Sequence, residues 1–222
     1  HQRKMKGTKE IRAVPTQKPT MSGDYLEGLT IPFNVVSEQL AIIREDKSVV
    51  LFREKIAKTA LDGLNLQGVK CVGDHDEQNF FLGIAPKTLE LTAGDDGLYY
   101  RCSIPPSKKQ IVSERVERGE YEGNSFLFMV AENGDSWETM PDGTYLRTVN
   151  KISWLGHVGP VLSPAYKQTN LEVAQRSLEM YLSINVSVCV EQEQEAPEAV
   201  SNSGDMEEED LRLKEMYYKS MC

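Results

Sequence analysis

The segment Ser107–Ala131 reads SKKQIVSERVERGEYEGNSFLFMVA and contains signals for both a helix and a strand. Its last part, Ser125–Ala131, is an almost unbroken apolar run that follows a turn containing Gly123 and Asn124. Such a run after turn residues is typical of a β-strand. A helical pattern comes before the turn, so the stretch predicts a helix, a turn and an apolar strand that opens on a serine.

The helix in this stretch has a start signal and a stop signal. Ser107 and Gln110 form a capping-box pattern, and Gly119 stands where a C-terminal cap belongs. A helix over about 108–118 is therefore expected, with one apolar face made by Ile111, Val112 and Val116.

A second helix is predicted over about 170–182, because Thr169 and Glu172 repeat the capping-box pattern. One side of that helix is apolar and carries Leu171, Ala174, Leu178, Tyr181 and Leu182. A weaker pattern predicts a short helix near Ala57–Leu61.

Strands outnumber helices in the rest of the chain. Period-2 and short apolar segments recur between turn signals such as Ala93–Gly97 (AGDDG) and Met140–Gly143 (MPDG). Spacing of this kind suits a closed barrel. We therefore expect an α+β, mainly β fold, an antiparallel β-barrel surrounded by a few helices, with strands at Ile11–Val14, Tyr25–Asn34, Val49–Glu54, Val69–Gly73, Phe80–Leu91, Leu98–Ser103, Ser125–Ala131 and Tyr145–Leu155.

Length and composition limit the class of protein. The chain has 222 residues and a mass of 25.0 kDa, enough for one or two domains with a hydrophobic core, which excludes a peptide hormone or a disulfide miniprotein. The longest nearly apolar stretch, Tyr181–Val190, is about half of what spans a bilayer, so a soluble protein is expected. The four cysteines, which have neither zinc-site spacing nor disulfide density, indicate free thiols in a reducing cytosol: Cys71, Cys102, Cys189 and Cys222.

Most of the net charge of -9 lies at the end of the chain. Residues 191–222 contain ten acidic and three basic residues, so nucleic acid is not an expected partner. Residues 191–208 are expected to be disordered, since their composition cannot bury enough apolar surface to offset chain entropy. Glu209–Met221 has the pattern of an amphipathic helix that would form on a partner.

Two histidines stand beside turn residues at strand ends. His75 lies in GDHDE, at 73–77, and His157 lies in WLGHVGP, at 154–160. One interpretation makes both ordinary structural residues. A second makes them metal ligands with Asp74, Asp76 and Glu77, although no close histidine pair such as HExxH is present. We expect neither a metal nor a cofactor.

Nucleophilic catalysis is the remaining chemistry that a histidine supports. Cys71 is four residues from His75, but on one strand two such side chains share a face without meeting. A hydroxyl with a histidine base is the other arrangement, and no G-x-S-x-G motif selects the serine. Ser125 has a usable setting at the start of its apolar strand, and the alternative is an ordinary strand-edge serine.

Twelve short segments, in this order, resemble the prohead (capsid maturation) serine proteases of tailed bacteriophages. The resemblance covers roughly residues 9–182 and is specific through order and spacing rather than through any one segment. The segments are Lys9–Ala13, Leu26–Gly28, Pro32–Asn34, Phe52–Ile56, His75-Asp76 with Leu82-Gly83, Thr88–Leu91, Gly97-Leu98, Asn124–Phe128, Arg147–Val149, Val158–Val161 and Pro164–Tyr166.

The resemblance implies a herpesvirus-protease-like fold and gives roles to the site residues. His75 matches the catalytic histidine of the family and Ser125 its nucleophile. Family members usually have an acidic residue where this chain has His157. The herpesvirus proteases, however, use a second histidine, in the order His, Ser, His. His157 is therefore expected to orient His75, with Asp76 or Asp74 as substitutes.

An oxyanion hole is expected from backbone N–H groups in the loop Ser163–Tyr166, by analogy with the herpesvirus fold. Pro164 cannot donate, so Ala165 and Tyr166 are the candidates. The alternative for this loop is a simple turn that leads into the helix at 170–182.

The resemblance also implies partners and location. The expected substrates are scaffold protein, the scaffolding region of the major capsid protein and the chain itself, inside the assembling prohead in the host cytoplasm. A homodimer is compatible with it, and neither nucleic acid nor membrane is expected. The alternative is a noncatalytic scaffold or assembly protein that binds capsid protein through the acidic tail.

The composition and the resemblance together divide the chain into three parts. Residues 1–8 are expected to be a disordered N-terminus that begins with a cloning remnant. Residues 9–185 are expected to form the protease domain, and 186–222 an acidic, mostly disordered tail.

Overall fold

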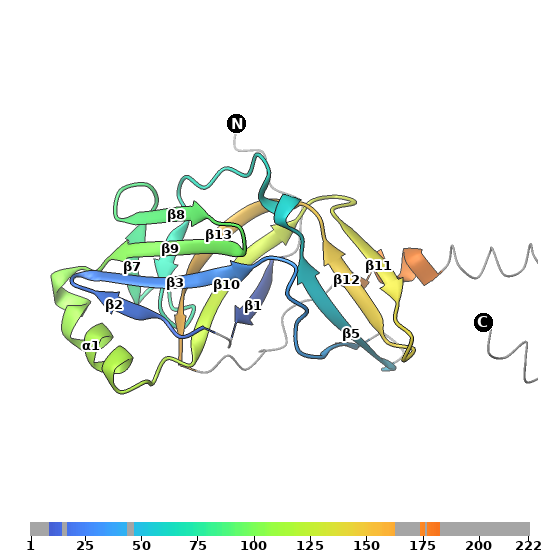
Figure 1. Cartoon of the computed structure of the whole chain (residues 1–222), viewed down its shortest axis with the longest axis horizontal. Coiled ribbons are helices and arrows are strands. Elements are labelled where there is room, and N and C mark those ends of the chain that lie inside the picture. Colours follow the sequence, from blue (N-terminus) through green and yellow to red (C-terminus); the bar gives the residue numbers. More distant parts are fainter. Residues whose placement is uncertain (1–8, 15–16, 44–46, 163–173, 176, 183–222) are drawn as a thin grey trace, which may run out of the picture. The chain divides into compact units, whose positions relative to one another are not determined.

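The computed structural model describes residues 9–14, 17–43, 47–162, 174–175 and 177–182. The chain divides into two compact units, residues 1–177 and 178–222. In the described part, the first unit contains thirteen strands in three sheets, together with one α-helix and one short 3₁₀ helix (Figure 1). The mainly β class predicted from the sequence is confirmed. Among the described residues, no helix is both long and apolar enough to cross a membrane.

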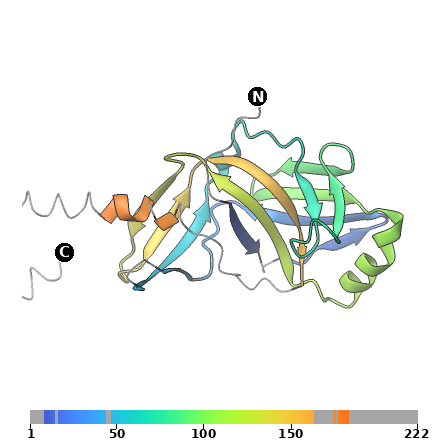
Figure 2. The same cartoon turned by 180° about the vertical axis from the view of Figure 1, so that it is seen from behind.

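The largest sheet has the strand order β1-β10-β13-β6-β7. Its strands are β1 (Glu10–Val14), β10 (Gly123–Val130), β13 (Ile152–Val161), β6 (Lys70–Val72) and β7 (Phe81–Ile84). All pairs are antiparallel except β13 with β6, which is parallel. Every residue of β10 is buried, which explains why this strand reads as an apolar run without alternation. Figure 2 shows β10 and β13 side by side from behind.

A second sheet, of four antiparallel strands, packs against the first through a shared apolar core. Its order is β2 (Thr20–Ser22), β3 (Tyr25–Pro32), β9 (Gly97–Ser103) and β8 (Leu89–Ala93). The core between the two sheets joins residues that alternate along each strand, as the period of a β-strand requires, among them Leu26, Tyr100, Cys102, Phe126, Phe128 and Val158.

The third sheet has the order β11 (Asp135–Thr139), β12 (Tyr145–Val149), β5 (Val49–Ile56) and β4 (Leu40–Ile43). The β12–β5 pair is parallel and the other two pairs are antiparallel. Only Asn150 and Lys151 separate β12 from β13, so this short connection joins the third sheet to the first.

The helices agree in place with the prediction but differ at their ends. Helix α1 spans Pro106–Glu117 and is capped by Pro105 without a side-chain hydrogen bond, so the predicted capping box at Ser107 is wrong. Proline at the first helical position has the φ angle that a helix needs and lacks an N–H that would be unpaired. Gly119 adopts φ 68° and ends the helix as predicted.

The other predicted helices have different outcomes. The short helix predicted near Ala57–Leu61 is a 3₁₀ helix, η1 (Lys58–Leu61). Residues 174–175 and 177–182 are helical, and the start of the predicted helix at 170–182 lies outside the described residues.

Two predicted strands are each two strands in the structure. Phe80–Leu91 breaks into β7 and β8 at a turn over 85–88, and Tyr145–Leu155 breaks into β12 and β13. Strands β2, β4 and β11 were not predicted. In the described part of the chain the three sheets stay open, so the predicted closed β-barrel is not found there. The likeness to the herpesvirus proteases stays a prediction.

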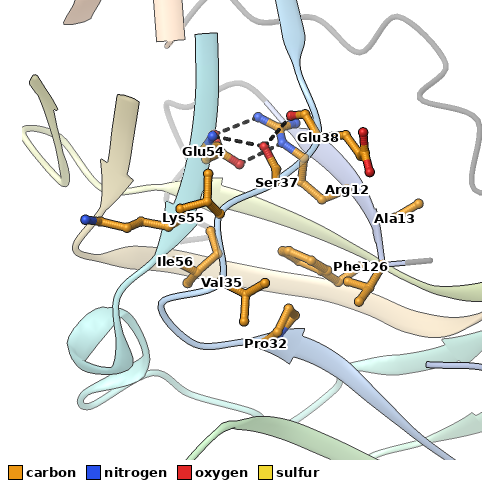
Figure 3. Close-up of a pocket in the computed structure, with 12 residues that line it drawn as sticks. Arg12, Ala13, Pro32, Val35, Ser37, Glu38, Glu54, Lys55, Ile56 and Phe126 are labelled. Carbon is orange, nitrogen blue, oxygen red and sulfur yellow. Dashed lines mark hydrogen bonds and ion pairs between the residues drawn. The ribbon is translucent and has the colours of Figure 1, made fainter. Parts of the chain in front are cut away.

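A buried cluster of charges ties β1 to the third sheet. Arg12 on β1 donates to both carboxylate oxygens of Glu54 on β5, at 2.7 and 2.9 Å (Figure 3). Arg147 on β12 donates to Glu10 and to Glu54 at 2.8 Å each, and to Asp135 at 2.6 Å. Every member of this cluster is almost fully buried. Such charges are stable in the interior only because each is paired and hydrogen-bonded.

The pairing controls ionisation in the cluster. Burial alone would raise the pKa of Glu54, but the neighbouring guanidinium groups of Arg12 and Arg147 outweigh burial and lower this pKa below its ordinary value of 4.5. Burial likewise acts to lower the pKa of Arg147, and the carboxylates of Glu10 and Glu54 raise it above its ordinary value. Both groups therefore stay charged at neutral pH.

Substituting Arg147→Met should lower the free energy of unfolding by about 3–5 kcal/mol, because it leaves buried carboxylates without their cation. Urea denaturation followed by tryptophan fluorescence measures this change. Lys58→Met is the matched control, since Lys58 pairs with Asp95 in an exposed ion pair, and such a pair contributes at most about 1 kcal/mol. Equal losses in the two variants would contradict the structural role of the cluster.

Acidification should destabilise the fold through Glu54. Its pKa is lowered by folding, so its contribution to stability is complete above the ordinary value of 4.5 and is lost as the pH falls through the lower folded value. Urea midpoints measured across this range should fall for the natural chain. Glu54→Gln should be less stable at neutral pH, and its difference from the natural chain should narrow below pH 4.5. Two parallel curves would exclude Glu54 as the titrating group.

Candidate active site

The pairing of β10 with β13 places Ser125 and His157 on one face of the largest sheet. Ser125 lies opposite Gly159, and His157 lies opposite Leu127. Because side chains two residues apart on a strand share a face, Ser125 and His157 are diagonal neighbours. Both are buried, with exposed fractions of 1% and 4%.

Gly159 is needed where β13 passes close to β6. Its φ of 152° is a conformation that favours glycine, and a Cβ atom there would lie 2.1 Å from the carbonyl oxygen of Val72. The close approach brings the end of β6 next to β13, and the loop that carries His75 starts at this end.

The loop between β6 and β7 turns His75 back over the sheet. Asp74 and His75 have φ angles of 51° and 61°, in the left-handed region that costs energy for residues other than glycine. The loop is closed by hydrogen bonds from the Gly73 N–H to the Phe80 carbonyl (3.0 Å) and from the Phe80 N–H to the Asp76 carbonyl (2.8 Å). Two strained residues in succession, held by such bonds, are typical of a functional site.

The two aspartates beside His75 hold this loop in place. Asp74 accepts a hydrogen bond from the N–H of Leu162, just after β13, at 2.8 Å, and one from Arg115 on α1 at 3.3 Å. Asp76 accepts hydrogen bonds from the backbone and side chain of Asn79 at 2.9 Å each. The sequence offered both aspartates as substitutes for His157, but in the structure it is His157 that contacts the ring of His75.

Four side chains form a continuous chain of hydrogen bonds. The Ser125 Oγ lies 2.8 Å from His75 Nε2, and His75 Nδ1 lies 2.7 Å from His157 Nε2. At the far end, His157 Nδ1 lies 3.4 Å from the Glu77 Oε1. The other carboxylate oxygen of Glu77 accepts a hydrogen bond from Lys70. A hydroxyl next to an imidazole that is itself oriented by another group is the arrangement of an activated nucleophile.

Burial and charge act in opposite directions on His157. Burial lowers the pKa of His157 below its ordinary value of 6.5, and the Glu77 carboxylate only partly offsets this effect. The hydrogen bond from Lys70 is the main cause that lowers the pKa of Glu77. At neutral pH the far end of the chain is therefore a neutral imidazole beside a carboxylate.

The Ser125 hydroxyl has a second neighbour, on β1. Its Oγ lies 2.7 Å from the carbonyl oxygen of Arg12. The backbone around Ser125 is also fixed, because Thr30 donates to the Ser125 carbonyl at 3.3 Å and Tyr100 donates to the Asn124 side chain at 2.7 Å. The hydroxyl therefore has two acceptors within reach, the Arg12 carbonyl and the His75 ring.

A groove borders β1 on its side toward β5 (Figure 3). Its lining includes Phe126, which follows Ser125 on β10. Because successive side chains on a strand point to opposite faces, the ring of Phe126 points away from the Ser125 hydroxyl. The Phe126 side of the groove therefore faces away from the Ser125 hydroxyl, while Arg12 in the same lining accepts a hydrogen bond from that hydroxyl through its carbonyl. The lining residues are Arg12, Ala13, Val14, Pro32, Val35, Val36, Ser37, Glu38, Glu54, Lys55, Ile56 and Phe126.

The structure brings together the three residues that the resemblance selected: Ser125, His75 and His157. The Cys71 alternative is disfavoured, because Cys71 is fully buried and burial raises the pKa of its thiol well above the ordinary value. In the described part of the chain, no group of three histidine, cysteine, aspartate or glutamate side chains is arranged to hold a metal ion. Ala165 and Tyr166, the oxyanion candidates, lie outside the described residues.

Sequence reasoning missed the contact between Glu77 and His157. It considered Glu77 only as a metal ligand, although a carboxylate two residues after a candidate base is a usable signal. The Arg12 carbonyl was also missed, and no side-chain pattern could have indicated it.

Comparison with known proteins gives one finding. A sequence profile described as caudovirus prohead serine protease matches residues 12–184 of the 222. This span includes all four members of the hydrogen-bonded chain. A search of curated proteins and a search of solved structures found no significant match.

Proposed function

The chain belongs to the prohead serine protease family of the caudoviruses, and on this premise we propose that Ser125, His75 and His157 are the catalytic residues of a serine endopeptidase. The single observation that carries the proposal is the unbroken contact from the Ser125 hydroxyl through His75 to His157. The three residues come from two strands and a strained loop, and all lie within the span that the family profile matches.

In the proposed mechanism, Ser125 Oγ attacks the carbonyl carbon of the scissile peptide bond while His75 Nε2 takes the hydroxyl proton. A C–O bond forms and the resulting imidazolium is stabilised through its Nδ1–H, which donates to His157 Nε2. His75 then gives the proton to the leaving amine as the C–N bond breaks. The product is an ester between Ser125 and the acyl part of the substrate.

Water completes the cycle by the same route in reverse. His75 removes a proton from the attacking water, the new C–O bond forms, and the proton returns to the Ser125 oxygen as the ester breaks. Imidazole suits both steps, because its ordinary pKa lies near neutral pH and it can accept and then donate a proton.

The family supports a role in capsid maturation, with capsid or scaffold proteins as substrates, inside the assembling capsid in the host cell. We propose that the substrates are scaffold protein or the scaffolding region of the major capsid protein, and that the chain also cleaves itself. In this proposal the protease domain spans residues 9–185, and the acidic segment 186–222 holds the enzyme in the prohead or is removed by self-cleavage.

Ser125→Ala and His75→Ala should each lower cleavage by about 10³-fold or more, because each removes a group that handles the transferred proton or the acyl group. The double variant should be no slower than either single one, since the two groups act as a unit. Gel electrophoresis and mass spectrometry, with the full chain and purified capsid protein as substrates, measure the rates. Ser103→Ala is the matched control. Substantial cleavage by Ser125→Ala would transfer the role to another serine.

His157→Ala should slow cleavage by less than the Ser125 and His75 substitutions, because base and nucleophile remain and water can replace part of the lost hydrogen bond. A loss of about 10-fold to 10³-fold is expected. Val158→Ala is the matched control, because Val158 is a fully buried neighbour on the same strand whose side chain points to the opposite face. Full activity of His157→Ala would leave His157 a structural residue.

A further inference from the structure

We propose that Glu77 is a positioning residue that sets the direction of every hydrogen bond in the chain from Ser125 to His157. The inference rests on the proposed function of Ser125 and His75 and deepens it. The Glu77 carboxylate bonds to His157 and to Lys70. It acts through His157, because its carboxylate determines which ring nitrogen of that histidine carries the proton.

Glu77 is held in place by two contacts to neighbouring strands of the largest sheet. Its Oε1 lies 3.4 Å from Nδ1 of His157 on β13, and its Oε2 accepts a hydrogen bond from Lys70 on β6. Lys70 and His157 are themselves register partners in the parallel β6–β13 pair. The carboxylate therefore spans two paired residues, one of which is the third member of the catalytic chain.

Counting protons along the chain shows what the carboxylate does. An ionised carboxylate only accepts hydrogen bonds, so it favours the tautomer of His157 with a proton on Nδ1. His157 Nε2 then has a lone pair and accepts from His75 Nδ1–H. His75 Nε2 in turn has a lone pair and accepts from the Ser125 hydroxyl. In this arrangement the base is ready to take the hydroxyl proton.

The same atoms allow a second arrangement that is inactive. If His157 carries its proton on Nε2, it donates to His75 Nδ1, and His75 Nε2–H donates to Ser125 Oγ. The hydroxyl then donates to the Arg12 carbonyl, 2.7 Å away. Every bond between Ser125 and His157 is still made, but His75 has no lone pair facing the nucleophile. Only the contact between His157 Nδ1 and Glu77 changes from attractive to repulsive, because a ring lone pair then faces a carboxylate.

Lys70 makes the two substitutions of Glu77 unequal. In Glu77→Gln the ammonium of Lys70 attracts the single amide oxygen, so the amide NH₂ faces His157 Nδ1 and donates to it. This donation selects the inactive arrangement. In Glu77→Ala no side chain at position 77 favours either arrangement of the hydrogen bonds. Ser125 should therefore react more slowly in Glu77→Gln than in Glu77→Ala. A loss of packing alone would produce the reverse order.

The test uses the rate at which a small fluorophosphonate modifies Ser125 in the full chain, which needs no peptide substrate. In this reaction the Oγ–P bond forms, fluoride leaves, and His75 takes the proton. Glu77→Ala should react about 10-fold more slowly and Glu77→Gln about 100-fold more slowly than the natural chain. Lys70→Met should react no more slowly than Glu77→Ala, because the carboxylate that faces His157 Nδ1 remains although it is no longer held from β6. The double variant Lys70→Met/Glu77→Gln should recover to the rate of Glu77→Ala, because the amide is free to turn.

A spectroscopic readout reports the tautomers directly. The chain has three histidines, so the ring ¹⁵N spectrum of labelled protein is assigned with His75→Ala and His157→Ala. In the natural chain Nδ1 should be the protonated nitrogen of both His75 and His157, and in Glu77→Gln it should be Nε2. A structural role of Glu77 would change stability without exchanging these nitrogens.

The outcomes separate the two levels of the proposal. Unchanged modification of the His75→Ala variant, or none in the natural chain, would overturn the proposed function. Loss of modification in His75→Ala with equal rates in both Glu77 variants, or unchanged ring nitrogens in Glu77→Gln, would overturn the role of Glu77 alone. Asp76→Asn is the control for a change in loop structure. It alters a hydrogen bond of the same loop, to Asn79, and leaves the carboxylate that faces His157.

Discussion

The pairing of β10 with β13 is the constraint on which the candidate site depends. Ser125 lies opposite Gly159, and His157 lies two residues earlier on β13, so a single register fixes the positions of Ser125 and His157 together. A slip of one residue would turn one of the two side chains to the other face of the sheet. β13 also pairs with β6, whose last residue leads into the loop of His75. One strand therefore positions both histidines relative to the hydroxyl.

The buried charges connect this constraint to the rest of the fold. Arg12 bonds through its side chain to Glu54 in the third sheet and through its carbonyl to the Ser125 hydroxyl. Buried ion pairs often add little stability relative to apolar residues, because desolvation offsets their attraction. We infer that the cluster favours the pairing of these particular strands, since Glu10 and Arg12, which also bond to each other, complete their hydrogen bonds on Arg147 and Glu54. The surroundings of Ser125 thus depend on contacts made in another sheet.

The sequence predicted those parts of the site that have a local signal or that match the family to which the chain is similar. The apolar run of β10 and the glycine after α1 are local signals, and the resemblance to a family selected Ser125, His75 and His157. The split of Phe80–Leu91 had a signal in Pro86, which cannot donate in a ladder. No sequence signal of comparable strength pointed to Glu77. Its contact with His157 depends on the β6–β13 register and on the left-handed backbone of His75.

In the proposed triad, a histidine as the third member creates a problem that a carboxylate does not have. A carboxylate only accepts, so a Ser-His-carboxylate chain has one direction, whereas each imidazole of a Ser-His-His chain can donate from either nitrogen. In the inactive direction the Ser125 hydroxyl donates to the Arg12 carbonyl, so the hydroxyl proton has an acceptor in either direction. The direction of hydrogen-bond donation must then be set by a group beyond His157. Glu77 is the carboxylate at that position, and its side chain is 42% exposed. The direction in which protons are donated at buried Ser125 is thus set by Glu77, the solvent-exposed end of the row of hydrogen bonds.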